Sequence, residues 1–136
     1  MKNIISISFF LAAIIFSCSK DTGSSSESLN QVDIDLMNKL QEDVFKYFWD
    51  YTHQYSKLSR ERIHENNISF DQNTVTIGGS GFGFLNILVG IENQFITRSQ
   101  GVNHLVIALN FLENANRFHG AWPHWMDGNS GEVIPF

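Results

Sequence analysis

The sequence is poor in cysteine, in proline and in clustered positive charge. Of its 136 residues, one is cysteine and two are proline, and nine lysines and arginines stand against fourteen aspartates and glutamates, which gives a formal net charge of −5. A single cysteine excludes an intrachain disulfide. Without a basic patch to neutralise phosphates, nucleic acid is not an expected partner. With 43% hydrophobic residues, the chain is expected to hold one acidic domain at most.

The first 17 residues have the pattern of a signal peptide. Lys2 supplies a positive charge, and residues 4–16 are apolar except for two serines. This apolar segment is too short for a membrane-spanning helix, which needs about 20 residues. We therefore expect the segment 1–17 to be a targeting signal rather than part of the fold.

Cys18 ends a short segment, Ile-Phe-Ser-Cys, that resembles a bacterial lipobox. The resemblance predicts lipidation of Cys18, and the alternative is a free or disulfide-bonded thiol. The next residues are small and polar, so the segment 18–30 is expected to be a lipidated, flexible tether. The Ser-Lys-Asp at 19–21 resembles an export signal of bacterial surface lipoproteins. We expect an outer membrane lipoprotein, periplasmic or surface-exposed, that contacts the membrane through its lipid anchor.

Hydrophobic periodicity predicts three helices in the rest of the chain, and so an all-α fold. The first begins after Asn30 and runs to about Thr52, and its aromatic last turns are expected to be mostly core rather than a sugar platform. The second, residues 85–91, is apolar on nearly all sides. Residues 97–100 have the pattern of a capping box that opens the third helix, which ends near Asn116. These apolar faces need more neighbours than three helices supply.

Between the first two helices lies a long polar segment, residues 53–73, which predicts a loop. Loops of this length in compact domains are usually functional or disordered. Arg60 and Arg62 stand at its centre, on either side of Glu61. Their guanidinium groups could hold sugar hydroxyls or orient a carboxylate, and the alternative is a solvated charged loop. Glu61 is expected to pair with the two arginines rather than to act as an acid catalyst.

The stretch 76–84, Thr-Ile-Gly-Gly-Ser-Gly-Phe-Gly-Phe, contains four glycines. Glycines let the backbone adopt positive φ and let other groups approach closely. The spacing disfavours nucleotide binding, because Phe84 stands where G-x-G-x-x-G needs its last glycine and no Lys-Ser/Thr follows. The stretch instead predicts a turn at the entry to a helix, forming a pocket rim that brings Ser80 and Phe82 to a site.

Residues 117–125, Arg-Phe-His-Gly-Ala-Trp-Pro-His-Trp, are the best candidate for binding by their chemistry. Aromatic side chains with polar tips on an extended or turning segment are typical of carbohydrate sites, which stack sugar faces and bond hydroxyls. A metal site is not expected, because His119 and His124 lie five residues apart with no third ligand nearby. No cofactor is implied.

Four patterns in the chain together resemble the start of the glycoamylase-like family of glycoside hydrolases, which includes bacterial endo-β-1,2-glucanases and related glucosidases. They are Leu-Ser-Arg-Glu-Arg at 58–62, the stretch 76–84, Val-Gly-Ile-Glu at 89–92 with Phe-Ile-Thr-Arg at 95–98, and Phe-His-Gly-Ala-Trp-Pro-His-Trp at 118–125. The resemblance implies an (α/α)6 toroid of twelve helices whose funnel-like end binds glucan. With three helices, the segment 31–136 is expected to be the N-terminal portion of a truncated toroid.

The resemblance further implies a β-glucan-acting hydrolase fragment with a glucan or oligosaccharide as its partner. Glycoside hydrolysis needs two carboxyl groups at a defined separation, and no pair of acids in this chain has a spacing that fixes one. In the family these carboxylates lie beyond Phe136, so no catalytic residue is assigned and the chain is expected to be inactive alone. The alternative is a small non-enzymatic surface lipoprotein that binds carbohydrate or a partner protein. The expected substrate-binding residues are Arg60, Arg62, Ser80, Phe82, His119, Trp122, His124 and Trp125.

Overall fold

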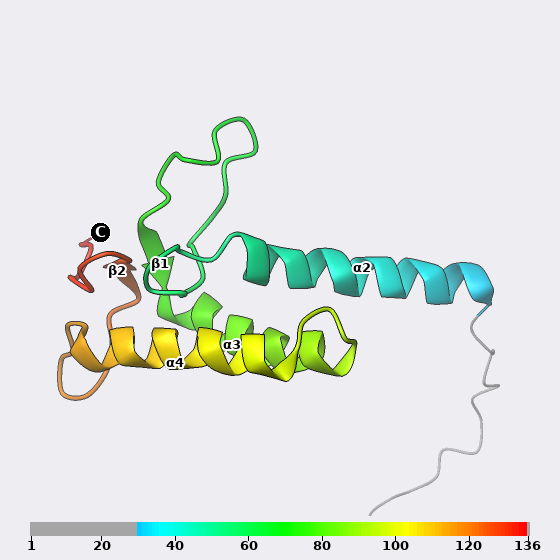
Figure 1. Ribbon diagram of the computed structural model, residues 1–136. Helices are drawn as coiled ribbons and strands as arrows, with labels where there is room; N and C mark the ends of the chain where they lie inside the picture. The colour runs from blue at the N-terminus through cyan, green and yellow to red at the C-terminus, as the bar shows by residue number, and fades with distance from the viewer. Residues whose placement is uncertain (1–29, 136) are drawn as a thin grey trace, which may run out of the picture. The chain divides into compact units, whose positions relative to one another are not determined.

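The computed structural model describes residues 30–135, in which three helices and two short strands form the regular structure. The predicted signal peptide 1–17 and the lipidation site Cys18 lie outside the described residues. None of the helices in the described part is long and apolar enough to cross a membrane. Figure 1 shows the elements, which are α2 (Gln31–Asp50), β1 (Thr74–Thr76), α3 (Ile77–Glu92), α4 (Arg98–Asn114) and β2 (Trp125–Asp127).

Helix α2 confirms the predicted first helix, and its C-terminal half packs against the other helices. Phe45 is buried, and its ring stacks with that of Trp49 at a centroid separation of 5.8 Å. Both rings belong to a hydrophobic cluster with Ile87 and Ile96, so the aromatic turns are core, as expected. In the N-terminal half of α2, by contrast, Leu36 and its apolar neighbours are exposed rather than buried.

The glycine stretch is not the predicted turn but the first part of α3. Gly78, Gly79, Gly81 and Gly83 all lie within this helix, and none has positive φ. The prediction was wrong because β1 ends at Thr76 and the helix starts at the next residue, so no turn separates them. The close approach that glycine permits is present, since a Cβ at Gly83 would lie 2.6 Å from the Ser59 hydroxyl oxygen.

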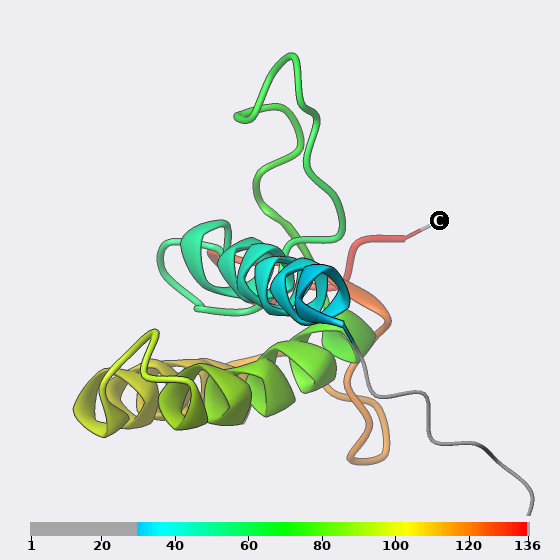
Figure 2. The same ribbon diagram turned by 90° about the vertical axis from the view of Figure 1, so that its right-hand side faces the viewer.

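Helix α4 begins with the predicted capping box. The Thr97 hydroxyl accepts a hydrogen bond from the Gln100 N–H at 3.2 Å, and the Thr97 N–H donates to the Gln100 side-chain oxygen at 2.8 Å. Figure 2 shows α4 beside α3. Gly101 allows this closeness, because a Cβ there would lie 2.7 Å from the Ile91 side chain.

The two strands are a feature that the sequence did not predict. β1 and β2 pair antiparallel, with Val75 opposite Met126, and both of these side chains are fully buried. They join Leu58, Ala108 and Leu112 in a second hydrophobic cluster. Strands of three residues are too short for hydrophobic alternation to stand out in a sequence. The ladder ties the loop 53–73 and the C-terminal segment to the start of α3.

Candidate functional site

Arg62 and His124 lie close to the carboxylate of Glu61 beside the β1–β2 ladder, and Trp125 lies against His124. The Arg62 guanidinium donates to Glu61 Oε1 at 3.0 Å, and its hydrogen bond is the main cause that lowers the pKa of Glu61. Positive charge on His124 acts in the same direction. The rings of His124 and Trp125 meet edge to face, with centroids 4.9 Å apart. We call Glu61, Arg62, His124 and Trp125 the ladder site.

Backbone hydrogen bonds fix the ladder site to the fold. Glu61 N–H donates to the Thr74 carbonyl at 2.9 Å, and the His124 carbonyl accepts from Ile77 N–H at 3.2 Å. Trp125 pairs with Thr76 across the ladder. The ladder site therefore presents guanidinium and imidazole groups beside an indole ring, a combination that can bond hydroxyls and stack on a sugar face.

Arg60 has a different environment from Arg62. Its side chain is 7% exposed, and Nη2 donates to the carbonyls of Ile68 at 2.7 Å and Phe70 at 3.2 Å. The expectation that Glu61 pairs with both arginines is thus confirmed for Arg62 and wrong for Arg60, whose fork is directed to backbone oxygens of the loop. Within the described chain, the Nε atom of Arg60 is buried without a hydrogen-bond partner.

A small cavity of about 110 Å³ lies where Arg60 meets the turn that follows α2. Sequence reasoning missed its buried residue His53, whose Nδ1 accepts from the Ser56 N–H at 3.3 Å. The proton is therefore on Nε2, which lies 3.3 Å from the side-chain oxygen of Asn73. No signal in the sequence joins His53 to Asn73, because they are twenty residues apart in an irregular segment. The cavity is lined by Thr52, His53, Gln54, Arg60, Gln72 and Asn73.

Ser80 and Phe82 occupy contrasting positions on α3. Ser80 is 1% exposed, and its hydroxyl donates to the Thr76 carbonyl at 2.6 Å and accepts from the Ser59 N–H at 2.9 Å. Both contacts are internal to the fold and join the first turn of α3 to the loop. Phe82 is 69% exposed. Neither residue is brought to the ladder site by a contact within residues 30–135.

His119 and Trp122 belong to a second group at the end of α4. His119 and Gly120 have φ of 50° and 85° and form a tight turn, closed by reciprocal N–H to carbonyl bonds of 2.9 and 3.0 Å between Phe118 and Ala121. The Trp122 indole N–H donates to the Leu112 carbonyl at 3.0 Å. A largely apolar cavity of about 590 Å³ is lined by residues of 116–123 and by Val133.

Metal ligands do not gather anywhere in residues 30–135. No group of three or more His, Cys, Asp or Glu side chains in this part of the chain could hold an ion. The eight predicted binding residues thus divide into three at the ladder site, two near the end of α4, two buried in the fold's own hydrogen bonds, and one exposed on α3.

Known proteins resemble this chain over most of its length. An exo β-1,2-glucooligosaccharide sophorohydrolase of Parabacteroides distasonis is 38% identical over 112 residues, which is 82% of this chain and 15% of that protein. The endo-β-1,2-glucanase of Chitinophaga pinensis, solved with sophorotriose and glucose, is 48% identical with a TM-score of 0.71, over 76% of this chain and 25% of that one. A candidate glucoamylase structure from Bacteroides caccae is 44% identical with a TM-score of 0.73, over 76% of this chain and 26% of that one.

These relatives are much longer than the matched part. The chain spans about a quarter of the two solved structures and 15% of the sophorohydrolase. No protein-family model matches it. The three helices match the corresponding part of glucoamylase-like structures, which is consistent with the predicted part of an (α/α)6 toroid. The resemblance that the four motifs predicted is confirmed: this chain is related to a portion of the glycoamylase-like proteins that include the β-1,2-glucan hydrolases.

Proposed function

We propose that this chain supplies one wall of the substrate site of a β-glucan hydrolase and that its ligand is a β-1,2-linked glucan. The observation that carries the proposal is the pair Arg62 and His124 beside Glu61, with Trp125 against His124, in a chain 48% identical to part of an endo-β-1,2-glucanase. Successive glucose units expose hydroxyl groups at the ring edge and C–H groups on the ring face. Guanidinium and imidazole donors suit the hydroxyls, and an indole suits the face.

We infer that the chain binds glucan without cleaving it. Glycoside hydrolysis requires a carboxylic acid that keeps its proton until the leaving oxygen takes it, together with a second carboxylate. Glu61 is the acid of the ladder site, and its pKa is lowered by the hydrogen bond from Arg62, so it is an anion at neutral pH. An ion-paired carboxylate of this kind can position Arg62, but it carries no proton to donate to a leaving group. The two catalytic carboxylates are assigned to the part of the domain outside this chain.

We also propose that Cys18 carries a lipid that anchors the protein in the bacterial outer membrane. The lipobox-like segment and the polar residues that follow it support this assignment. Metabolic labelling with an alkyne fatty acid tests it, since a Cys18→Ser variant should lose both the label and sedimentation with the membrane fraction. Undiminished labelling of that variant would contradict the anchor.

The glucan proposal is tested by calorimetric titration of the full chain with sophorotriose. Saturable binding that is lost in Arg62→Ala and in His124→Ala is expected, and an equal response to a β-1,3-linked trisaccharide would contradict the linkage. Lys39→Ala, on the ion-paired face of α2, is the matched control and should bind like the unmodified chain. A reducing-sugar assay on the same samples should detect no product, and normal turnover would overturn the non-catalytic assignment.

A further inference from the structure

Arg60 is a buried positive charge whose negative partner is missing from the described chain. Its side chain is 7% exposed, and none of the ion pairs within residues 30–135 includes it. Nη2 donates to two backbone carbonyls, which carry only partial charge. Nε is buried without a hydrogen-bond partner, and Nη1 also donates to no group in this part of the chain. Arginines are rarely buried unless a counter-charge accompanies them, because an uncompensated charge is costly to bury.

The cavity of about 110 Å³ beside Arg60 has the lining of an anion site. A single water needs about 10–15 Å³ of such space, so this volume admits a small ion. Apart from Arg60, its lining consists of one threonine, one histidine, one asparagine and two glutamines, with no acid among them. The amides of Gln54 and Gln72 supply further N–H donors. Both glutamines are exposed, so an ion can reach the cavity from solvent.

Two titratable residues close to the cavity do not supply the missing negative charge. His53 is neutral at pH 7, because burial lowers its pKa and the positive charge of Arg60 acts in the same direction. Asp127 acts on His53 through space, but its Oδ1 accepts hydrogen bonds from the N–H groups of Asn129 and Ser130 in its own turn. It forms no ion pair with Arg60. The guanidinium group therefore still lacks a counterion.

The cavity is separate from the ladder site, because the two lie on opposite faces of one extended segment. Arg60 forms a bridge with Val75, and the N–H of the next residue, Glu61, donates to the Thr74 carbonyl. Successive side chains of an extended segment point to opposite faces. Arg60 thus lies on the face of the cavity and Glu61 on the face of the ladder site. A neutral glucan at the ladder site would leave the charge of Arg60 uncompensated.

We propose that the cavity beside Arg60 binds a small oxyanion of the phosphate or sulfate class and that this ion holds the loop 61–73 in place. The full negative charge of such an ion supplies the counter-charge that a neutral sugar cannot. The connection to the loop is direct, because the same guanidinium group bonds the carbonyls of Ile68 and Phe70. Figure 1 shows this loop projecting between α2 and β1. The proposal does not depend on the glucan ligand.

Calorimetric titration of the full chain with inorganic phosphate at pH 7 tests the site, with the ionic strength held constant by sodium chloride. We expect saturable binding. Gln72→Glu places a carboxylate on the cavity wall and should weaken this binding about tenfold or more, because like charges at short distance repel. Gln41→Glu adds the same charge to an exposed position of α2 and should bind phosphate like the unmodified chain. Absence of saturable binding, or equal weakening in both variants, would overturn the proposal.

Limited proteolysis tests the effect of the ion on the loop. Phosphate should slow cleavage within residues 61–73 of the unmodified chain, and sodium chloride of equal ionic strength should not. The Gln72→Glu chain should be cut at the same rate with and without phosphate, and Gln54→Glu replaces it if that variant does not fold. An unchanged cleavage rate of the unmodified chain at saturating phosphate would overturn the role of the ion in holding the loop. Sophorotriose is absent from both experiments, so failure of the glucan proposal would not alter their results.

Discussion

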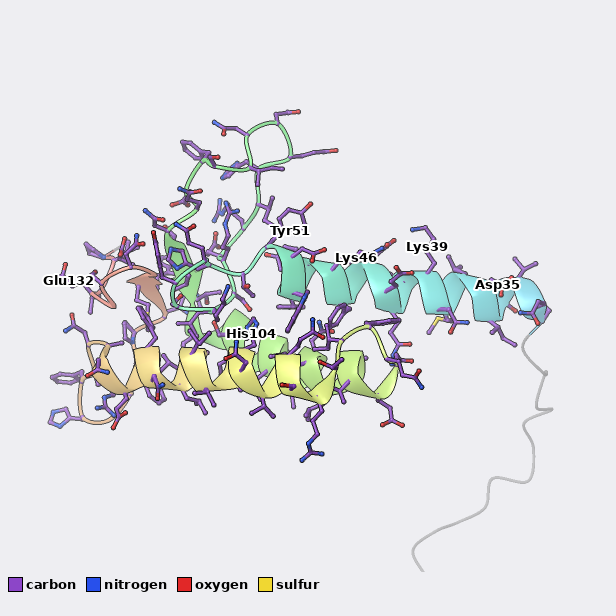
Figure 3. All side chains as sticks on the ribbon, in the orientation of Figure 1. Asp35, Lys39, Lys46, Tyr51, His104 and Glu132 are labelled. Carbon is purple, nitrogen blue, oxygen red and sulfur yellow. The ribbon has the colours of Figure 1, made fainter. Side chains whose placement is uncertain are left out.

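The imidazole of His104 lies flat against the indole of Trp49, with ring centroids 5.0 Å apart and ring planes inclined by 25°. Its Nε2 lies 2.9 Å from the Lys57 carbonyl, so the neutral ring donates a hydrogen bond from this nitrogen. Figure 3 shows His104 on α4, and the stack with Trp49 connects this helix to α2. One buried histidine thus joins α4, α2 and the turn between Thr52 and Leu58.

Burial lowers the pKa of both His104 and His53 below the ordinary value of 6.5. Between the lowered values and 6.5 the unfolded chain binds more protons than the folded one, so the free energy of unfolding falls as pH falls below 6.5. Above that pH the contribution is constant. Urea unfolding followed by tryptophan fluorescence at a series of pH values measures the slope. His104→Gln should reduce the slope, and an equal slope in this variant and the unmodified protein would contradict the assignment.

Gly90→Ala tests the contact between α2 and α3. The added Cβ would lie 2.1 Å from a carbon of the buried Phe45 ring, which is much closer than two carbon atoms can approach. We expect a loss of about 1–3 kcal/mol in the free energy of unfolding, typical of overpacking. Gly81→Ala is the matched control on the same helix, since nothing lies within 4 Å of its added Cβ. It should stabilise the protein by about 1 kcal/mol through helix propensity, and a loss as large as that of Gly90→Ala would refute the assigned contact.

The helices could be predicted from the sequence because their signals are local. The periodic apolar residues of α2 and the capping box at Thr97 each lie within a few residues of the structure that they specify. The entry to α3 could not be predicted in the same way. Whether Gly79 and Gly83 turn the chain or admit a neighbour depends on Ser59 and Phe48, which come from distant parts of the sequence. The local glycine pattern predicted a turn, whereas the structure has a helix whose glycines make room for these distant side chains.

Arg60 and Arg62 form a natural comparison, since they are two residues apart and have opposite environments. Arg60→Ala removes two charge-assisted hydrogen bonds to the carbonyls of Ile68 and Phe70, which should cost about 1–3 kcal/mol and release the loop 61–73. Limited proteolysis should then cut this loop faster. Arg62→Ala breaks an exposed ion pair and should leave the cleavage rate unchanged. Equal protection of the loop in both variants would show that Arg60 does not hold it.

The capping box gives a prediction for α4 alone. Thr97→Ala removes the hydroxyl that accepts from the Gln100 N–H and should cost about 1 kcal/mol. The neighbouring exposed Ser99→Ala retains the box and should change stability little. Hydrogen exchange at the first turn of α4 measures the local effect. Faster exchange there in both variants alike would indicate that the cap does not set the start of the helix.

The candidate site was only partly accessible to sequence reasoning, for a reason visible in two residues. Trp125 was selected because it stands in a motif of polar-tipped aromatic side chains, and Ser80 because it stands in the glycine stretch. Trp125 pairs with Thr76 at the ladder. The Ser80 hydroxyl instead donates to the Thr76 carbonyl and accepts from the Ser59 N–H. A motif identifies which residues are constrained. It does not distinguish a side chain constrained by a ligand from one constrained by its own backbone.

Strand β1 ends at Thr76 and α3 begins at Ile77, so no residue between them is free to serve as a hinge. The first residue of α3 also donates its N–H to the His124 carbonyl. The backbone of the ladder site is therefore coupled directly to the start of α3. A ligand at the ladder site would meet a backbone already held in place, so little backbone conformational entropy would be lost on binding.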